Sequence, residues 1–202
     1  MTDSYKPTLT IFTMSNKSDF ILYEKVLDKC IKIMSDFSPK KLHLISNSRE
    51  EYSKFITSGS IPLETDFVLV VQVDGFILNP SAWDNKFFEF DYIGAPWPHL
   101  ENRTGNGGFS LRSKKLNDAL KDIFLNIPEE NYKSENLYQE DVYICINKRK
   151  ILEEKYGIKF APFEIASKFS VEDRNYTNQF GFHGKYVFNR LNKNLLKEYF
   201  LD

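Results

Sequence analysis

Apolar residues in the first third of the chain alternate between strand-like runs and helix-like spacing. The runs at 9–14, 42–45 and 67–73 are short and rich in β-branched or aromatic residues, which predicts three strands. Between the first two runs, apolar residues recur every three or four positions, as one buried face of a helix requires: Phe20, Tyr23, Val26, Leu27, Cys30, Ile31, Met34 and Phe37. Pro39 ends this helix, and residues 50–57 are expected to form a second, shorter helix.

The alternation of strands and helices predicts an α/β fold. The run at 67–73 is continuously apolar at its start, which is typical of a strand covered on both faces in a parallel sheet. We therefore expect a mostly parallel central sheet flanked by helices, with ligands bound where the strands end. The other expected elements are strands at 92–95 and 109–112, helices at 113–124, 139–155 and 186–199, and a polar loop at 126–136.

Length, charge and cysteine content narrow the class of protein. The 202 residues, 42% of them hydrophobic, suffice for one domain with one core. The formal net charge of −1 gives no general attraction to nucleic acid or anionic membrane. The two cysteines, Cys30 and Cys145, lie in apolar surroundings, outside any CxxC pattern, and are expected to be buried free thiols. The polar start of the chain is unlike a signal peptide, and the densest apolar run is too short to be a transmembrane segment. We expect a soluble, cytoplasmic protein.

Two glycine-containing segments are candidates for ligand binding. Gln72-Val-Asp74-Gly75 follows the most buried strand, so that Asp74 lies at the mouth of the sheet. Mg²⁺ and Mn²⁺ prefer carboxylate and phosphate oxygens, although an Asp-Gly turn is also common after a strand. The second segment, 105–112 (GNGGFSLR), contains glycines that allow close approach of backbone N–H groups to a substrate; the alternative is an ordinary loop.

Two further segments carry residues suited to catalysis or metal binding. Glu140 and Asp141 begin the helix expected at 139–155, where carboxylates serve either as helix caps or as a general base. His183 lies in the segment 180–184 (FGFHG), between glycines and aromatic residues. A neutral imidazole is a usual ligand of Mn²⁺-type ions, although a lone histidine more often has a structural role.

Taken together, these segments resemble one known protein family. Six stretches, in this order, carry the resemblance: 70–80 (VVQVDGFILNP), 91–97 (DYIGAPW), 105–113 (GNGGFSLRS), 140–142 (EDV), 160–170 with FAP at its start and FS at its end, and 180–184 (FGFHG). The sequence resembles the DUF5672 family, which is regarded as glycosyltransferase-like with a GT-A fold. The resemblance covers residues 66–184.

The resemblance implies a role for each of these residues in a single GT-A-like domain. About 1–75 would form the nucleotide-binding half, and about 76–202 the acceptor and catalytic half. Asp141, or else Glu140, resembles the catalytic base of inverting enzymes, and Asp74 with His183 resembles a site for a divalent metal, Mn²⁺ or Mg²⁺. The remaining implied site residues are Gln72, Asp74 and Gly75 for the nucleotide donor, and Trp97, Asn106, Gly107, Gly108 and Phe109 for the acceptor or sugar.

The implied activity is the transfer of a sugar from a nucleotide-diphosphate donor, with a UDP-sugar favoured, to an acceptor hydroxyl. The acceptor is expected to be a glycan, a lipid-linked glycan or a modified nucleic acid. The basic clusters at 112–115 and 148–150 could bind the phosphates of the last two classes; the alternative is that they are solvated helix faces. Gln72 stands where the superfamily often has a carboxylate, which keeps open a non-catalytic module that binds sugar nucleotides or glycans. A nucleotidyltransferase is disfavoured because Ser15-Asn-Lys-Ser18 lacks the glycine-rich loop expected after its first strand.

Overall fold

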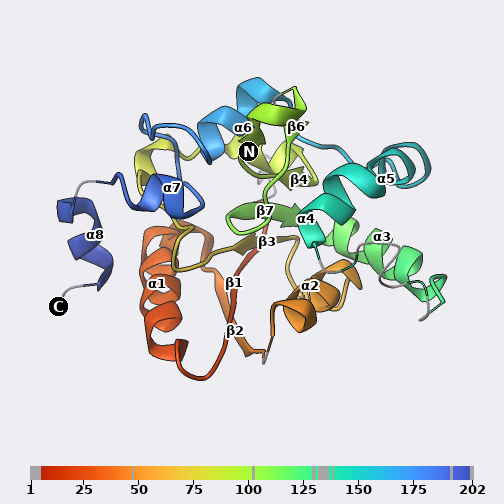
Figure 1. Cartoon of the computed structure of the whole chain (residues 1–202), viewed down its shortest axis with the longest axis horizontal. Helices are drawn as coiled ribbons and strands as arrows, with labels where there is room; N and C mark the ends of the chain where they lie inside the picture. Colours follow the sequence, from red (N-terminus) through yellow and green to blue (C-terminus); the bar gives the residue numbers. More distant parts are fainter. Residues whose placement is uncertain are drawn as a thin grey trace, which may run out of the picture.

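Five strands form the central sheet, in the order β2-β1-β3-β7-β4 (Figure 1). They are β1 (Leu9–Ser15), β2 (Lys40–Ile45), β3 (Phe67–Val70), β4 (Tyr92–Ile93) and β7 (Ser110–Ser113). Strand β1 pairs in parallel with β2 and β3, whereas β7 runs antiparallel to both β3 and β4. All strands except β7 therefore point the same way, which confirms the mostly parallel sheet predicted from the sequence.

The structure, a computed structural model, describes residues 6–46, 48–101, 103–128, 131, 137, 139–191 and 193–200. The polar residues 1–5 and most of the loop predicted at 126–136 lie outside these ranges. The helices are α1 (Phe20–Ile33), α2 (Arg49–Thr57), α3 (Lys114–Leu125), α4 (Glu140–Val142), α5 (Arg149–Tyr156), α6 (Phe163–Phe169), α7 (Lys185–Phe188) and α8 (Lys193–Phe200). None of these helices is long and apolar enough to cross a membrane.

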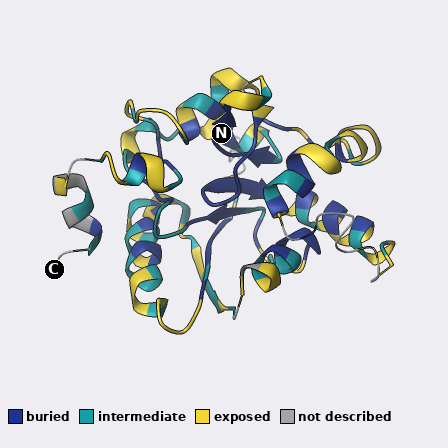
Figure 2. Cartoon of the chain, in the orientation of Figure 1, coloured by how far each residue is buried: buried dark blue, intermediate teal, exposed yellow. Residues whose placement is uncertain are grey.

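The sheet separates two hydrophobic cores. Successive side chains of a strand point to opposite faces, so Val68 and Val70 join one core while Leu69 and Val71 join the other. The core containing Leu69 is closed by α1, α6, α7 and α8, and the core containing Val68 by α2, α3 and α5. Figure 2 shows the strands β1, β3 and β7 as mostly buried, between helices with exposed outer faces, whereas the edge strand β2 is partly exposed. The continuously apolar β3 thus lies between two layers of helices.

Several element boundaries differ from those predicted. The helix expected at 139–155 is divided into α4, a π-helical turn (Tyr143–Asn147) and α5. The strand expected at 67–73 ends at Val70, because the backbone then turns back on itself at Gln72. The C-terminal helix expected at 186–199 is divided into α7 and α8. The sequence did not predict α6 or the small hairpin of β5 (Pro96–Trp97) and β6 (Arg103–Thr104).

The two cysteines are buried and free, as predicted. Burial disfavours the thiolate and raises the pKa of Cys30 to about 12. Burial also raises the pKa of Cys145. Both thiols therefore stay protonated and unreactive at neutral pH.

Phe109 lies in the core, whereas the family resemblance implied a place in the acceptor or sugar site. Its side chain has no exposed surface. Its ring is stacked on Phe169 with 5.1 Å between centroids and lies 5.9 Å from the ring of Phe180. A sugar cannot reach this ring without displacing the core.

We expect Phe109→Ala to lower the free energy of unfolding by about 3–5 kcal/mol, because it leaves a cavity among packed aromatic rings. Urea denaturation followed by circular dichroism measures the change. The matched control is Phe163→Ala, which removes an exposed ring and should cost about 1 kcal/mol or less. Equal stability of Phe109→Ala and the wild type would show that Phe109 is not a core residue.

Candidate functional site

A polar pocket of about 510 Å³ opens where β1, β2 and β3 end. This is the edge of an open α/β sheet at which ligands generally bind. The pocket is lined by Met14, Ser15, Asn16, Asp19, Tyr23, Ser46, Ser48, Tyr52, Gln72, Asp74, Gly108, Glu140, Asp141 and His183. Six of the residues predicted for the site from sequence line it: Gln72, Asp74, Gly108, Glu140, Asp141 and His183.

Asp74 lies at the tip of a tight turn directly after β3. The backbone groups of Gln72 and Gly75 exchange two hydrogen bonds, of 2.7 and 3.1 Å, which leaves Val73 and Asp74 between them. The backbone N–H of Gly184 donates to the carbonyl of Asp74 over 2.7 Å. The turn therefore brings the Asp74 carboxylate to the pocket and joins it to the segment that carries His183.

The imidazole of His183 lies between two groups of polar side chains. Its Nε2 is 3.2 Å from Oε1 of Gln72 and 3.9 Å from Oδ1 of Asp74. Its Nδ1 is 3.1 Å from Oε1 of Glu172 and 2.8 Å from Nδ2 of Asn106. Burial opposes the charged form, but the hydrogen bond and the negative charge of Glu172 outweigh it and raise the pKa of His183 above its usual value.

The glycines at 105–108 leave room for side chains from other segments. A Cβ on Gly108 would lie 2.0 Å from Nε2 of His183, and a Cβ on Gly107 would lie 1.7 Å from Oε1 of Glu140. A Cβ on Gly75 would lie 2.7 Å from Cδ2 of His183. Gly108 still lines the pocket. The space beside these glycines is filled by His183 and Glu140 rather than left for a substrate, and the sequence did not predict this packing.

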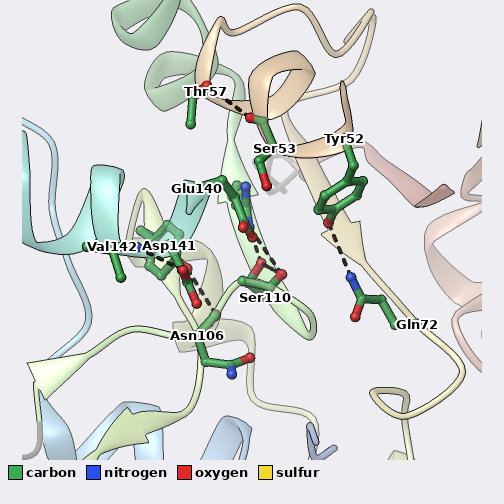
Figure 3. Close-up of polar contacts among 12 residues, drawn as sticks. Tyr52, Ser53, Thr57, Gln72, Asn106, Ser110, Glu140, Asp141 and Val142 are labelled. Atoms are coloured by element: carbon green, nitrogen blue, oxygen red, sulfur yellow. Dashed lines mark hydrogen bonds and ion pairs between the residues drawn. The ribbon is translucent and has the colours of Figure 1, made fainter. Parts of the chain in front are cut away.

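Glu140 and Asp141, adjacent in sequence, have different surroundings (Figure 3). Glu140 is buried, and its Oε1 is 3.3 Å from Nη2 of Arg112, which also donates to the carbonyl of Gly107 over 3.1 Å. Burial and the neighbouring charge of Asp141 raise the pKa of Glu140 despite the Arg112 cation. Asp141 is only half-buried, and its Oδ1 accepts a hydrogen bond from the backbone N–H of Val142 over 2.8 Å. Of the two carboxylates, Glu140 is held in a buried ion pair and Asp141 is the more exposed.

Trp97 and Asn106 lie beside the pocket rather than in its lining. Trp97 is 7% exposed and packs against Gly105, so little of its ring is available to the acceptor or sugar that the resemblance implied. Asn106 adopts a left-handed backbone conformation with φ of 51°, and its carbonyl accepts a hydrogen bond from the Tyr92 hydroxyl over 2.9 Å. Its side chain does not line the pocket but contacts His183, which does.

Tyr23, Tyr52 and Glu172 are among the residues of the site that were not assigned to it from the sequence. Tyr23 was predicted only as part of a buried helix face, and Tyr52 as part of a short helix; both line the pocket. Glu172 contacts His183 from the segment after α6. Neither tyrosine stands in a motif, and Glu172 is close to His183 only because the chain folds back after α6, so no sequence signal marks these residues.

The charges of the pocket are mostly negative. Carboxylates of Asp19, Asp74, Glu140 and Asp141 line it, and its described lining includes no lysine or arginine. A phosphate-containing ligand would meet repulsion here unless a cation accompanied it. The pocket therefore suits a cationic or uncharged ligand, or an anion bound together with a metal ion.

The donor atoms suit a divalent ion shared with a ligand rather than a complete protein cage. No group of three or more His, Cys, Asp or Glu side chains within the described ranges could hold a metal ion. Asp74 and His183 offer an oxygen and a nitrogen 3.9 Å apart, with the Gln72 amide oxygen beside them. Mg²⁺ in particular is commonly held by one or two carboxylates together with substrate phosphates. The residues present fit such an ion.

Comparison with known proteins identifies the family. The model of a family described as protein of unknown function (DUF5672) matches residues 36–183. The chain belongs to this family. The match confirms the resemblance seen in the motifs and begins earlier in the chain than they do.

No curated protein matches this DUF5672 chain. Seven chains of solved structures match it. One is the crystal structure of a glycosyltransferase involved in the glycosylation of the major capsid of PBCV-1. It is 16% identical, with 71% of this chain and 77% of that chain covered and a TM-score of 0.47.

Removing one partner of the buried Arg112–Glu140 pair should lower the stability of the protein strongly. We expect Arg112→Leu to cost about 3–5 kcal/mol in the free energy of unfolding, because it leaves a buried carboxylate without its cation. Adding Glu140→Gln should recover part of this loss, which a double-mutant cycle in urea measures. As the pH falls from 7 to 5, Arg112→Leu should regain stability relative to the wild type, because its folded state binds a proton at Glu140 more readily than the unfolded chain does.

The matched control is Lys114→Met, which breaks the exposed pair of Lys114 with Asp118 and should cost less than about 1 kcal/mol. If Arg112→Leu lowered the free energy of unfolding no more than this control does, the buried pair would not stabilise the site.

Proposed function

We propose that this DUF5672 protein is a glycosyltransferase with a GT-A-type fold, which transfers a sugar from a nucleotide-diphosphate donor to an acceptor hydroxyl. The observation that carries the proposal is the convergence of Asp74, His183 and Asp141 in one polar pocket at the carboxyl ends of parallel strands. These residues come from three distant segments of the chain, and each belongs to a motif through which the sequence resembles the family.

The donor diphosphate is proposed to bind beside Asp74 and His183. The negative lining of the pocket supports an accompanying divalent cation, Mn²⁺ or Mg²⁺, held by Asp74, His183 and the amide oxygen of Gln72. Such an ion, when bound, neutralises charge on the diphosphate leaving group. The hydroxyls of Tyr23 and Tyr52 and the polar groups at the end of β1 are then available to the ribose and base.

Asp141 is proposed as the general base. Its carboxylate takes the proton from the acceptor hydroxyl as that oxygen bonds to the anomeric carbon of the sugar, and the bond from this carbon to the diphosphate oxygen breaks. Attack from the side opposite the leaving group inverts the anomeric centre. Glu140 keeps its place in the buried pair with Arg112 and holds the start of α4 in position.

The acceptor is proposed to carry negative charge. A second pocket, of about 390 Å³, is lined by Arg103, Ile146, Arg149, Lys150 and Glu153. Arg149 is held there by Glu153, with 2.9 Å between Nε and Oε1, and by the ring of Phe160, 4.4 Å from its guanidinium carbon. Three cations against one carboxylate favour a phosphate-containing acceptor, such as a lipid-linked glycan or a modified nucleic acid, over a neutral glycan.

A non-catalytic module that binds sugar nucleotides or glycans is the second candidate. It is favoured by Gln72, which provides an amide where a carboxylate would hold a metal more strongly, and by the limited set of donors around His183. Such a module would bind a ligand in the same pocket without transferring a sugar.

Titration with nucleotides tests the donor site. We expect one of UDP, GDP, CDP and ADP to raise the melting temperature only with Mn²⁺ present, by about 5–10 °C when the ligand is at 100 times its Kd. Asp74→Ala and His183→Ala should abolish the rise, whereas the surface variant Asp118→Ala should retain it. Equal stabilisation without metal would contradict the roles of Asp74 and His183, and no stabilisation by any diphosphate would contradict the donor site.

Asp141→Asn tests transfer separately from binding. The amide cannot accept the proton, so kcat for release of the nucleoside diphosphate from its sugar, measured with a panel of acceptors, should fall by about 10²–10⁴-fold. The thermal shift with diphosphate and Mn²⁺ should persist in this variant. Glu154→Gln, an exposed change on α5, serves as the control. Unchanged turnover in Asp141→Asn would remove Asp141 as the base, and binding without turnover in the wild type would favour the binding module.

A further inference from the structure

The Nδ1 atom of His183 faces two polar side chains, one of which requires it to donate a hydrogen bond and the other to accept one. Oε1 of Glu172 lies 3.1 Å away, and Nδ2 of Asn106 lies 2.8 Å away. An ionised carboxylate only accepts hydrogen bonds, so Glu172 requires a proton on Nδ1. An amide nitrogen only donates, so Asn106 in this orientation requires Nδ1 to accept. The two neighbours thus favour opposite tautomers of the neutral imidazole.

Asn106 can adapt to either tautomer, whereas Glu172 cannot. Rotation of the Asn106 amide by half a turn presents its Oδ1 to Nδ1 instead of its Nδ2. That Oδ1 is buried and has no hydrogen-bond partner within the described part of the chain, so the rotation only exchanges the contact of Nδ2 with Nδ1 for one of Oδ1 with Nδ1. Neither oxygen of an ionised Glu172 can donate, and a bond from Nδ1–H to a carboxylate is about twice as strong as a neutral one. Glu172 therefore decides between the tautomers.

The tautomer determines what His183 presents to the pocket. With the proton on Nδ1, the lone pair of Nε2 points toward Oε1 of Gln72 and Oδ1 of Asp74, 3.2 and 3.9 Å away. None of these three atoms can then donate a hydrogen bond, so without a cation the Gln72 amide rotates to present its N–H₂ to Nε2. With the proton on Nε2, the same atom would donate to Gln72 and could not bind a cation. The ring itself has little freedom, because Gly75 and Gly108 both approach it closely.

We propose that Glu172 is a positioning residue that holds His183 in its Nδ1–H tautomer and so keeps Nε2 free to bind a divalent cation beside Asp74. The proposal rests on the metal-assisted function proposed above. Carboxylates that accept the second N–H of a metal-binding histidine typically change metal affinity by 10–100-fold when removed.

Nitrogen-15 NMR of the metal-free protein, with the imidazole neutral, tests the tautomer directly. We expect the wild type to carry the proton on Nδ1 of His183. Glu172→Ala should move it to Nε2, where Gln72 accepts it and Asn106 donates to Nδ1. Glu172→Gln should keep the proton on Nδ1, because its amide oxygen still accepts. A proton on Nε2 in the wild type, or an unchanged tautomer in Glu172→Ala, overturns the proposal.

Calorimetric titration of Mn²⁺ in the presence of the stabilising nucleoside diphosphate measures the consequence. Affinity should fall by about 10–100-fold in Glu172→Ala and by only a few-fold in Glu172→Gln. Glu164→Ala, which removes an exposed carboxylate from α6, should bind as the wild type does. Equal affinity in Glu172→Ala and the wild type overturns the positioning role.

The two measurements distinguish failure of this proposal from failure of the proposed function. A wild type that binds no Mn²⁺ contradicts the metal-assisted transferase, while the NMR spectra still decide whether Glu172 sets the tautomer. A wild type that binds Mn²⁺ with a tautomer independent of Glu172 contradicts the present proposal alone.

Discussion

The close approach of side chains to the backbone at 105–108 is the constraint on which the rest of the site depends. The ring of Trp97, the carboxylate of Glu140 and the imidazole of His183 each occupy space that a Cβ would fill at Gly105, Gly107 and Gly108. These side chains come from three different segments, so one short loop fixes their positions relative to one another. Arg112 strengthens the arrangement from within the sheet, because it binds both Glu140 and the carbonyl of Gly107.

The second organising element is the connection between the turn after β3 and the segment that ends in His183. Backbone hydrogen bonds join Gly184 to Asp74 and His183 to Val171, and Ile77 pairs with Gly181. Asp74 and His183 are more than a hundred residues apart in sequence, yet the backbone holds them at the same mouth of the sheet. A site that needs both side chains can therefore be rigid without a bound ligand.

Sequence patterns predicted the sheet well because β1 and β3 and their flanking helices have clear apolar periodicity. They also located Asp74, Asp141 and His183, each in a motif at the end of an element. They did not separate Glu140 from Asp141, since only the fold places the buried Arg112 beside one of them. Phe109 and Trp97 were interpreted as sugar-binding because an aromatic residue in a glycine-rich region looks the same whether it faces a ligand or the core. Glu172 carried no pattern at all, because its role arises from a contact across the fold.

The chemistry proposed for this DUF5672 protein depends on whether Asp74 and His183 bind one ion together with a diphosphate. The most direct measurement is a crystal structure with a nucleoside diphosphate and Mn²⁺, with the ion located by its anomalous scattering. We expect a single Mn²⁺ bound to Oδ1 of Asp74 and Nε2 of His183, with diphosphate oxygens completing its coordination. A diphosphate bound in the pocket without an ion between these two side chains, or an ion bound elsewhere, would contradict the proposed site.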